Sequence, residues 1–330
     1  MAVSTTPLLP PSAASSSQTT KPDRATVNSI DDAIETYVGS AGAAAQLLPA
    51  SLVAFAWVFD AQQTFINVFA DAMPPWHCTA PSCFAAGAPA SPCSLITPSS
   101  WSWSLPRHTS TVSSWSLQCA SPAILALPSS SFFAGCLAGN FLLSSLADTR
   151  LGRKNALVLS SLVMSVSAAL TAASPSLVPY AALRFICGFG RATVGTSALV
   201  LSTELVSRRW RDRVSMISFF CFTLGFLSLP AIAYVARAWS WRTLYLFTAA
   251  PSLAYTAVIY FVIKESPRWL LVRGRRSEAI ETIKTMTFGL SVANSSFTDI
   301  PSVEFDGGCP FGARCKHHSV SFERLINLGR

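Results

Sequence analysis

An ionisable side chain and several amides interrupt the first long apolar segment of this chain, residues 47–70. Asp60 lies about midway along the segment and is followed by Gln62, Gln63 and Asn67. If such a segment crosses a bilayer, a charged group at its centre is costly and faces a cavity or a partner. Two interpretations are open. Either Asp60, Gln63 and Asn67 line a polar path in which the carboxylate attracts a cation or exchanges a proton, or Asp60 forms a structural ion pair with an arginine of the fourth apolar segment.

That fourth segment, residues 179–206, carries two arginines, Arg184 and Arg191. They are seven residues apart, which is nearly two helical turns, so both side chains lie on about the same helical face. Arg184 is close to one end of the segment, and its guanidinium is expected to reach toward the membrane surface. Arg191 lies deeper, and we add it to the candidates for the polar path. Small residues around the two arginines indicate close packing of helices. They are Gly188, Gly190, Gly195, Ser197 and Ala198.

A short cluster of acidic and basic residues connects the second apolar segment to the third. It contains Asp148, Gly152, Arg153 and Lys154. Gly152 allows a sharp reversal of the chain, and Asp148 can accept hydrogen bonds from the basic residues or cap a helix N-terminus. A cluster of this kind can latch two helix bundles together in one conformation.

Related clusters follow the fourth and sixth apolar segments. Glu204 precedes a basic stretch that contains Arg211, and Glu265 begins the sequence Glu-Ser-Pro-Arg-Trp-Leu, which contains Arg268. Pro267 suits the first turn of a new helix. Glu265 and Arg268 can pair with the charged connections of earlier helices, and we assign them, with Glu204 and Arg211, to the same latch. The alternative is an ordinary basic stop after a membrane span.

Six apolar segments are long enough to hold these residues inside a membrane. A bilayer core about 30 Å thick needs about 20 apolar residues of helix, and only helices satisfy their own backbone hydrogen bonds in single spans of this kind. The segments are 47–70, 122–146, 156–173, 179–206, 214–236 and 243–263. Only 12% of the 330 residues are charged, about half of the usual share in soluble domains. The sequence therefore predicts an all-α membrane protein with a bundle of six transmembrane helices over residues 46–265.

Lys and Arg residues are distributed unevenly between the two ends of this bundle. Fifteen lie in the N-terminal tail and in the connections after the second, fourth and sixth helices, whereas three lie at the opposite end. The fifteen are Lys21, Arg24, Arg150, Arg153, Lys154, Arg208, Arg209, Arg211, Arg213, Lys264, Arg268, Arg273, Arg275, Arg276 and Lys284, and the three are Arg107, Arg237 and Arg242. The positive-inside rule places the N-terminus in the cytosol. Residues 1–45 then form a disordered cytosolic tail without a signal peptide, and residues 266–330 form a second cytosolic tail.

The long connection after the first helix, residues 71–121, is then extracytosolic. It contains Cys78, Cys83, Cys93 and Cys119, for which disulfide bonds are chemically permitted in that compartment. Four cysteines allow three pairings, and the sequence does not choose among them. The loop is also rich in tryptophan, which favours an ordered cap over the path, with an exposed loop merely tied by disulfides as the alternative.

Three of these motifs together resemble a known transporter family. The stretch Leu146–Lys154 resembles the signature of the major facilitator superfamily, although its acid-to-glycine spacing is one residue longer. The stretch Glu265–Leu271 resembles a motif shared by sugar porters and organic ion transporters. The stretch Arg184–Gly190, with Glu204 and the basic residues after it, resembles the fourth helix of organic cation/carnitine transporters, most of all their plant branch. The resemblance extends over residues 47–286.

This resemblance implies a fold and a function. The fold is the N-terminal six-helix bundle of the major facilitator type, with a long extracytosolic loop after helix 1. The function is secondary transport of organic cations or carnitine-like solutes by alternating access between two six-helix halves, of which this chain supplies one. The expected partners are the lipid bilayer, a small organic cation, a proton or sodium as coupling ion and a second transporter half. The expected location is the plasma membrane or the vacuolar membrane.

Two other functions remain open, and several classes are excluded. The chain is alternatively a non-transporting half that binds and modulates a full-length homologue, or a sugar-porter-like facilitator. Nucleic-acid binding is not expected, because the basic residues fall between apolar segments instead of forming one face. No phosphate-binding glycine loop or nucleophile elbow indicates an enzyme or ATP coupling. No cofactor is predicted, and Cys309, Cys315, His317 and His318 do not have the spacing of a zinc site.

After about residue 290 the sequence stops resembling the family and contains no further apolar segment. We therefore expect a protein that is truncated to the N-terminal half, with an atypical tail.

Overall fold

Six helical segments in the described part of the chain are long and apolar enough to cross a membrane. They extend over Gln46–Ala70, Pro122–Leu143, Arg153–Thr171, Leu177–Glu204, Arg208–Ala238 and Trp241–Val262. The prediction of an all-α membrane protein with six spans is thus confirmed. The third span begins three residues earlier than predicted because Gly152, with φ of 86°, reverses the chain directly before Arg153. Only glycine adopts this backbone conformation at little cost.

This architecture comes from a computed structural model, which describes residues 43–79, 93, 101–146, 151–275, 277–279 and 281–282. All of these belong to one compact unit, Ile30–Asp299. Several predictions concern residues outside the described ranges. They are the tail 1–42, Cys83, Asp148, the four Cys and His residues near position 315, and the atypical C-terminal segment.

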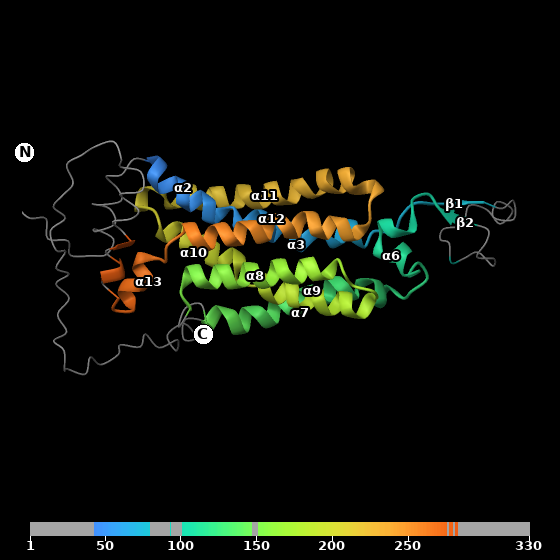
Figure 1. Cartoon of the computed structure of the whole chain (residues 1–330), viewed down its shortest axis with the longest axis horizontal. Coiled ribbons are helices and arrows are strands. Elements are labelled where there is room, and N and C mark those ends of the chain that lie inside the picture. The colour runs from blue at the N-terminus through green and yellow to red at the C-terminus, as the bar shows by residue number, and fades with distance from the viewer. Residues whose placement is uncertain are drawn as a thin grey trace, which may run out of the picture. The chain divides into compact units, whose positions relative to one another are not determined.

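Two of the six spans are divided by short breaks. The first span consists of α2 (Ala43–Ala54), α3 (Ala56–Phe65) and α4 (Asn67–Ala70), and the fourth consists of α9 (Leu177–Arg191) and α10 (Val194–Glu204). The other four are α7 (Pro122–Leu146), α8 (Arg153–Thr171), α11 (Arg211–Val235) and α12 (Trp241–Val262). Short 3₁₀ turns adjoin both ends of α11, η6 (Arg208–Trp210) and η7 (Ala236–Ala238), and α13 (Pro267–Val272) follows the last span (Figure 1). As predicted, Pro267 lies at the start of α13, where the Ser266 hydroxyl accepts a hydrogen bond from the Trp269 amide.

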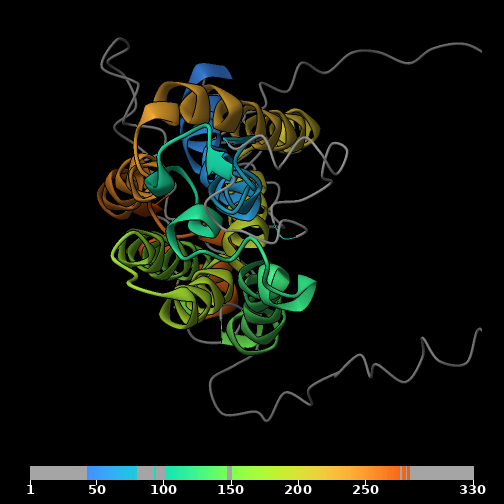
Figure 2. The same ribbon diagram turned by 90° about the vertical axis from the view of Figure 1, so that its right-hand side faces the viewer.

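The spans pack as two groups of neighbours that run along the bundle (Figures 1 and 2). In one group α9 lies between α7 and α8, and in the other α3 packs against α11. Helix α12 contacts both α8 and α3. Glycines permit the closest approaches: a Cβ atom at Gly188 would overlap the backbone of Phe132 in α7, and one at Gly225 would overlap the backbone of Val58 in α3. The predicted role of the small residues in packing therefore holds at Gly188.

The loop after the first span carries ordered structure of its own. A two-stranded antiparallel ribbon pairs β1 (Trp76–Cys78) with β2 (Trp101–Trp103). It is followed by the turn η4 (Arg107–Thr109) and the short helix α6 (Thr111–Ser114), in which Thr111, Val112 and Ser113 are buried. One disulfide joins Cys93 to Cys119, and Cys78 is also disulfide-bonded. The described part of the loop thus covers one end of the bundle, which we call the loop end; the opposite end is called the α13 end.

Candidate functional site

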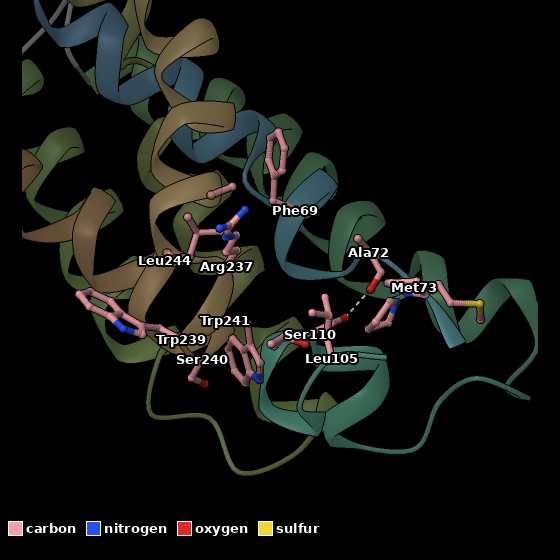
Figure 3. A pocket seen from close by; sticks show the side chains of 15 residues that line it. Phe69, Ala72, Met73, Leu105, Ser110, Arg237, Trp239, Ser240, Trp241 and Leu244 are labelled. Carbon is pink, nitrogen blue, oxygen red and sulfur yellow. Dashed lines mark hydrogen bonds between the residues drawn. The ribbon is translucent and has the colours of Figure 1, made fainter. Parts of the chain in front are cut away.

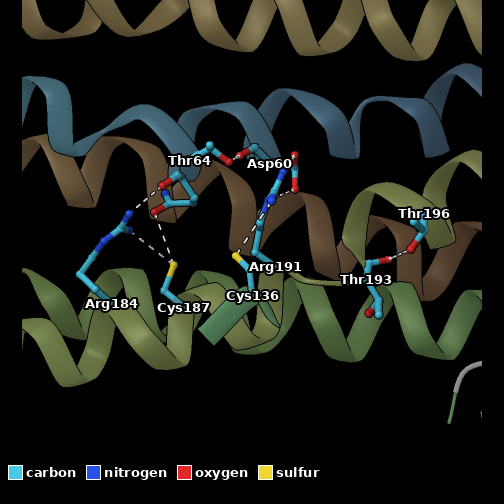
Figure 4. A network of polar contacts seen from close by, with 9 residues as sticks. Asp60, Thr64, Cys136, Arg184, Cys187, Arg191, Thr193 and Thr196 are labelled. Carbon is cyan, nitrogen blue, oxygen red and sulfur yellow. Dashed lines mark hydrogen bonds and ion pairs between the residues drawn. The ribbon is translucent and has the colours of Figure 1, made fainter. Parts of the chain in front are cut away.

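An ion pair between Asp60 and Arg191 lies in the middle of the bundle (Figure 4). Asp60 is on α3 and only 1% exposed, and Arg191 is the last residue of α9. The Arg191 Nε atom is 2.7 Å from Asp60 Oδ1, and Nη2 is 2.8 Å from Oδ2. Both carboxylate oxygens therefore accept a hydrogen bond in a bidentate arrangement, the strongest geometry available to these two groups. The structure brings these two candidates together and forms the ion pair that was one of the two interpretations of Asp60.

The two members of the pair are not equally accessible. The Arg191 side chain is 25% exposed, whereas that of Asp60 is 1% exposed. A molecule that approaches the pair from the open side therefore meets the guanidinium before it meets the carboxylate. An organic cation can contact Asp60 closely only if Arg191 moves away. Otherwise further residues must complete a binding site beside the pair.

Arg184 differs from the prediction. It was expected to reach toward the membrane surface, but its side chain is fully buried. Its Nη2 atom donates a hydrogen bond of 2.9 Å to the Gln63 carbonyl, and its guanidinium carbon is 4.3 Å from the centre of the Phe132 ring. The heptad spacing places Arg184 on the same inward face as Arg191, and the aromatic ring of α7 then covers it. The sequence shows the spacing but not that α7 supplies this cover.

The two amide candidates lie on the same side of the first span. Gln63 Nε2 donates to Thr248 Oγ1 of α12 at 3.1 Å, and Asn67 Nδ2 donates to Ser129 Oγ of α7 at 3.0 Å. The Asn67 side-chain oxygen accepts a hydrogen bond of 3.0 Å from the Tyr245 hydroxyl. Asp60, Gln63 and Asn67 thus face the neighbouring helices as one polar stripe.

Asp71 and its neighbours form a polar cluster that sequence reasoning missed. Asp71 Oδ1 accepts hydrogen bonds from the hydroxyls of Thr111 in α6, at 2.7 Å, and Tyr180 in α9, at 2.8 Å. The hydroxyl oxygen of Tyr180 also lies 2.8 Å from that of Tyr245. Burial raises the pKa of the Asp71 carboxyl above its ordinary value, while the hydrogen bonds from Thr111 and Tyr180 act in the opposite direction. The available signal was an acidic residue directly after an apolar span, in a loop that otherwise carries no acidic side chain up to residue 121.

At the α13 end, Glu265 binds the start of α8. Its Oε1 atom accepts hydrogen bonds from the backbone amides of Lys154, at 2.9 Å, and Ser266, at 3.0 Å. The carboxylate lies where any side chain at Gly152 would have to be. A negative charge at this position stabilises the N-terminus of α8. Glu265 therefore contacts the connection of an earlier helix, as predicted, but through backbone amides.

The other proposed latch residues lie in different environments. Arg153, Arg211 and Arg268 each have an interaction partner. One carboxylate oxygen of Glu204 is buried without a hydrogen bond. Asp148 lies outside the described residues. In the part of the chain that the structure describes, no group of three or more metal-ligating side chains is present.

Replacing Glu265 with glutamine tests the helix-capping role. The amide oxygen can still accept a hydrogen bond, but the negative charge at the α8 N-terminus is lost. We expect the free energy of unfolding to fall by about 1 kcal/mol, measured by thermal unfolding of the purified chain in detergent. Glu278→Gln is the matched control, because Glu278 forms an exposed ion pair with Arg275, and such pairs contribute little. Equal effects of the two substitutions would contradict the capping role.

The chain is similar to known transporters over most of its length. Residues 99–300 match the family model described as sugar (and other) transporter. Organic cation/carnitine transporter 2 of Arabidopsis thaliana is 53% identical over 274 residues, which are 83% of this chain and 50% of the relative. Organic cation/carnitine transporter 3 of the same plant is 48% identical over 91% of this chain and 57% of the relative. The chain thus spans about half the length of these relatives.

Solved structures share the fold at low sequence identity. A double-tryptophan mutant of XylE superimposes with a TM-score of 0.53 at 16% identity, over 73% of this chain and 50% of that one. A partially occluded inward-open form of the Escherichia coli xylose transporter XylE gives a TM-score of 0.51 at 18% identity, over 74% and 56% of the two chains. These comparisons support the fold of a half bundle.

Proposed function

Because this chain belongs to the sugar (and other) transporter family of the major facilitator superfamily, and is similar to its plant organic cation/carnitine transporters, we propose that it is the N-terminal half of a secondary transporter for small organic cations. In this proposal six helices of this chain and six of a second half alternate access to a site between them. No ATP is required, and the driving force is an ion or substrate gradient.

The observation that carries this proposal is the buried Asp60–Arg191 pair in the polar stripe of the first span. A carboxylate near the middle of a membrane helix is costly, and this one is accompanied by the amides of Gln63 and Asn67. The Asp60 carboxylate supplies a negative charge that attracts a cation. The Arg191 guanidinium has to move away when the cation binds to this carboxylate. The latch at the α13 end, with Glu265 on the α8 N-terminus, would stabilise one of the alternating conformations.

Two helices of the bundle have faces that no other part of the described chain covers. In an apolar stretch of 18 residues of the second span, only 28% of the residues are buried. In the corresponding stretch of the fifth span, only 22% are buried. Large apolar side chains on these faces are exposed, among them Phe141 and Leu142 of α7 and Phe219 and Phe220 of α11. A second half packed on these faces would cover them and complete the substrate site.

The proposed orientation places the loop end outside the cytosol and the α13 end, with the tails 1–45 and 266–330, inside. The excess of Lys and Arg at the α13 end supports it, and the disulfides of the loop agree with an oxidising compartment. The membrane is the plasma membrane or the vacuolar membrane. Protease protection of epitope tags placed at the N-terminus and in the loop tests this orientation.

Uptake measurements test the transport function. The protein is expressed in cells as a version that continues past Arg330 into a second six-helix half. Uptake of labelled choline, carnitine and a polyamine analogue is then measured. Uptake of labelled xylose is measured in parallel to test the alternative of a sugar facilitator. Asp60→Asn is expected to lower organic-cation uptake at least about tenfold, because the negative charge that attracts the cation is lost. Asp212→Asn, at an exposed position in the first turn of α11, is the matched control and should transport normally. Unchanged uptake in Asp60→Asn would remove Asp60 from the site.

A second function is favoured by the uncovered faces of α7 and α11. A chain of this kind can bind a full-length homologue on those faces and modulate it without transporting. Co-purification of this chain with such a homologue, together with the absence of uptake by any version of this chain, would favour this function over transport.

A further inference from the structure

We propose that Asp71, and not Asp60, is the carboxylate that exchanges a proton with the extracytosolic medium, and that the bound proton holds the loop helix α6 against the first, fourth and sixth spans. This inference rests on the orientation given in the proposed function and adds a proton-binding site at the loop end. It assigns the proton as the ion whose binding changes the conformation there.

The carboxylates of Asp60 and Asp71 differ in how their oxygens are occupied. Both oxygens of Asp60 accept hydrogen bonds from Arg191, so a proton can bind there only if a bond to the guanidinium is broken. In Asp71, Oδ1 accepts two hydrogen bonds, whereas Oδ2 is buried and has no partner. An unpaired anionic oxygen removed from water is unfavourable. A proton on Oδ2 removes the charge and leaves both hydrogen bonds to Oδ1 in place.

The groups around Asp71 do not neutralise it by direct contact. On α9, Tyr180 donates a hydrogen bond to it, and Arg184 acts on its charge from farther away, with the guanidinium hydrogen-bonded to the Gln63 carbonyl instead. On α12, the titratable group that acts on Asp71 is Tyr245, whose hydroxyl is in contact with that of Tyr180. The loop itself contributes the hydroxyl of Thr111. Two further titratable or charged side chains of the loop, Arg107 and His108, are exposed on η4. Among the described residues, Asp71 therefore contacts neutral hydroxyls, and Arg184 acts on its charge from a distance.

The sign of the pH dependence follows from this environment. Burial raises the pKa of Asp71 in the docked loop, whereas in an undocked loop Asp71 would have the ordinary value of about 3.9. The docked conformation therefore binds the proton more tightly, and by linkage the proton favours docking. The contribution of the bound proton to docking is fully present below the ordinary pKa of Asp71. It is progressively lost as the pH rises through the raised pKa of Asp71 in the docked loop. Acidification of the extracytosolic side thus favours closure of the loop end, and a rise of the pH above the raised pKa of Asp71 releases it.

The contacts of α6 are arranged so that they form or break together. The Ser110 hydroxyl donates to the Ala72 carbonyl beside Asp71 (Figure 3), and Trp241 Nε1 donates to Ser114 Oγ at 3.2 Å. Trp115 packs edge-on against Trp241, with ring centres 5.3 Å apart. Two of these contacts join the loop to Trp241 of the sixth span and one joins it to the end of the first span, and Trp115 also packs against Tyr180 of the fourth span, with ring centres 5.4 Å apart. Loss of the Asp71 contact therefore weakens a unit that also holds the fourth and sixth spans together at this end.

A chain of polar contacts extends from Asp71 toward the polar stripe of the first span. It runs through the hydroxyls of Tyr180 and Tyr245 to the Asn67 side chain and then to Ser129. Asn67 is one turn along the first span from Gln63, on the stripe that contains Asp60. The charge state of Asp71 can thus influence the geometry of the residues proposed to line the substrate path.

Direct observation of the proton tests this site. The complete chain is reconstituted in lipid nanodiscs, and the carbonyl stretch of protonated carboxyl groups is followed by infrared spectroscopy between pH 3 and 9 (about 1 unit below the ordinary pKa of Asp to well above it). A component that titrates above the ordinary range for Asp is expected in the unaltered chain and in Asp60→Asn, and it should be missing in Asp71→Asn. Thr111→Val should move its midpoint upward by about half to one pH unit, because a hydrogen bond that favours the carboxylate is lost. A component that remains in Asp71→Asn, or that disappears in Asp60→Asn, would overturn the assignment.

Accessibility of the loop tests the docking step. Val112 is 3% exposed and Leu105 is 40% exposed, so Val112→Cys reports undocking and Leu105→Cys corrects for the pH dependence of the thiol reaction. The ratio of their labelling rates with a membrane-impermeant maleimide should rise up to tenfold for each unit by which the pKa of Asp71 is raised. In the Asp71→Asn background, which mimics the protonated state, the ratio should stay low at every pH. A ratio that is independent of pH in the unaltered chain, or that follows sodium instead of pH, would refute the coupling.

Both measurements are made on this chain alone, and neither depends on transport activity. If the infrared component is not assigned to Asp71 but Asp60→Asn loses uptake, the transport proposal remains and the proton site is refuted. If the component is assigned to Asp71 but Asp60→Asn transports normally, the proton site remains and Asp60 is removed from the substrate site.

Discussion

Replacement of Arg191 with leucine is expected to lower the free energy of unfolding of the bundle by about 3–5 kcal/mol. The substitution removes both hydrogen bonds to Asp60 and leaves a carboxylate that is 1% exposed without a counter-charge. Among the described residues, no other basic side chain donates to Asp60 in its place. The measurement is thermal or denaturant unfolding of the purified chain in detergent, followed by tryptophan fluorescence.

A double substitution separates loss of the pair from damage to packing. Asp60→Asn combined with Arg191→Gln removes both charges and keeps side chains of similar shape that can hydrogen-bond to each other. We expect the double variant to recover most of the stability that Arg191→Leu loses, since replacing both partners of a buried pair is far less costly than removing one. If the double variant is as unstable as Arg191→Leu, the stability depends on packing around residue 191 and not on the charge pair.

The stability and transport effects of this pair should also differ. The double variant is expected to fold but to lose uptake of organic cations, because the group that attracts them is gone. A pair that served only the structure would tolerate this neutral replacement in both assays. The combination of restored stability and lost uptake therefore distinguishes a transport role from the purely structural interpretation of Asp60.

The sequence predicts the spans well because each depends on local information. Run length and apolar composition determine where a helix can cross a bilayer, and the six predicted segments agree with the observed ones to within a few residues except where a 3₁₀ turn or a glycine alters the start. The span 214–236 begins at Arg208 in the structure, because η6 and the first turn of α11 extend the helix toward the α13 end. Basic residues in this turn are compatible with a membrane helix, since their long side chains reach the interface.

The residues that were mispredicted or missed depend on contacts between distant segments. Arg184 was predicted to reach toward the membrane surface, but Phe132 of α7 and the Gln63 carbonyl of α3 enclose it. Asp71 appeared to be the first residue of a solvated loop, but Thr111, which lies 40 residues later, bonds to it from the docked helix α6. Periodicity identifies which residues share a helical face, but it does not show which helix covers that face. The Asp60–Arg191 pair was predictable as one of two alternatives because membrane burial itself requires a partner for each charge.

Gly188→Val is the second substitution with a very large expected effect. A Cβ atom at Gly188 would overlap the carbonyl group of Phe132 and approach the amide of Cys136, and these are backbone atoms of α7 that cannot rotate away. Gly135 on α7 meets the backbone of Phe185 on α9 in the same way, so the two helices touch along a shared glycine contact. Small residues that permit such contact are a main source of stability between membrane helices.

The branched side chain of valine would therefore force α7 and α9 apart and displace the helix that carries Arg184 and Arg191. We expect the loss to exceed about 4 kcal/mol, which is comparable to the whole stability of a marginal domain. The folded fraction, measured as the monodisperse peak of a fluorescent fusion after extraction in mild detergent, should fall at least about tenfold. Gly195→Ala is the control, because the three atoms nearest to its Cβ would all belong to the Trp57 ring, the first at 3.1 Å, and a side chain can move. A normal folded fraction for Gly188→Val would show that α7 and α9 are not held in the backbone contact on which the position of the Asp60–Arg191 pair depends.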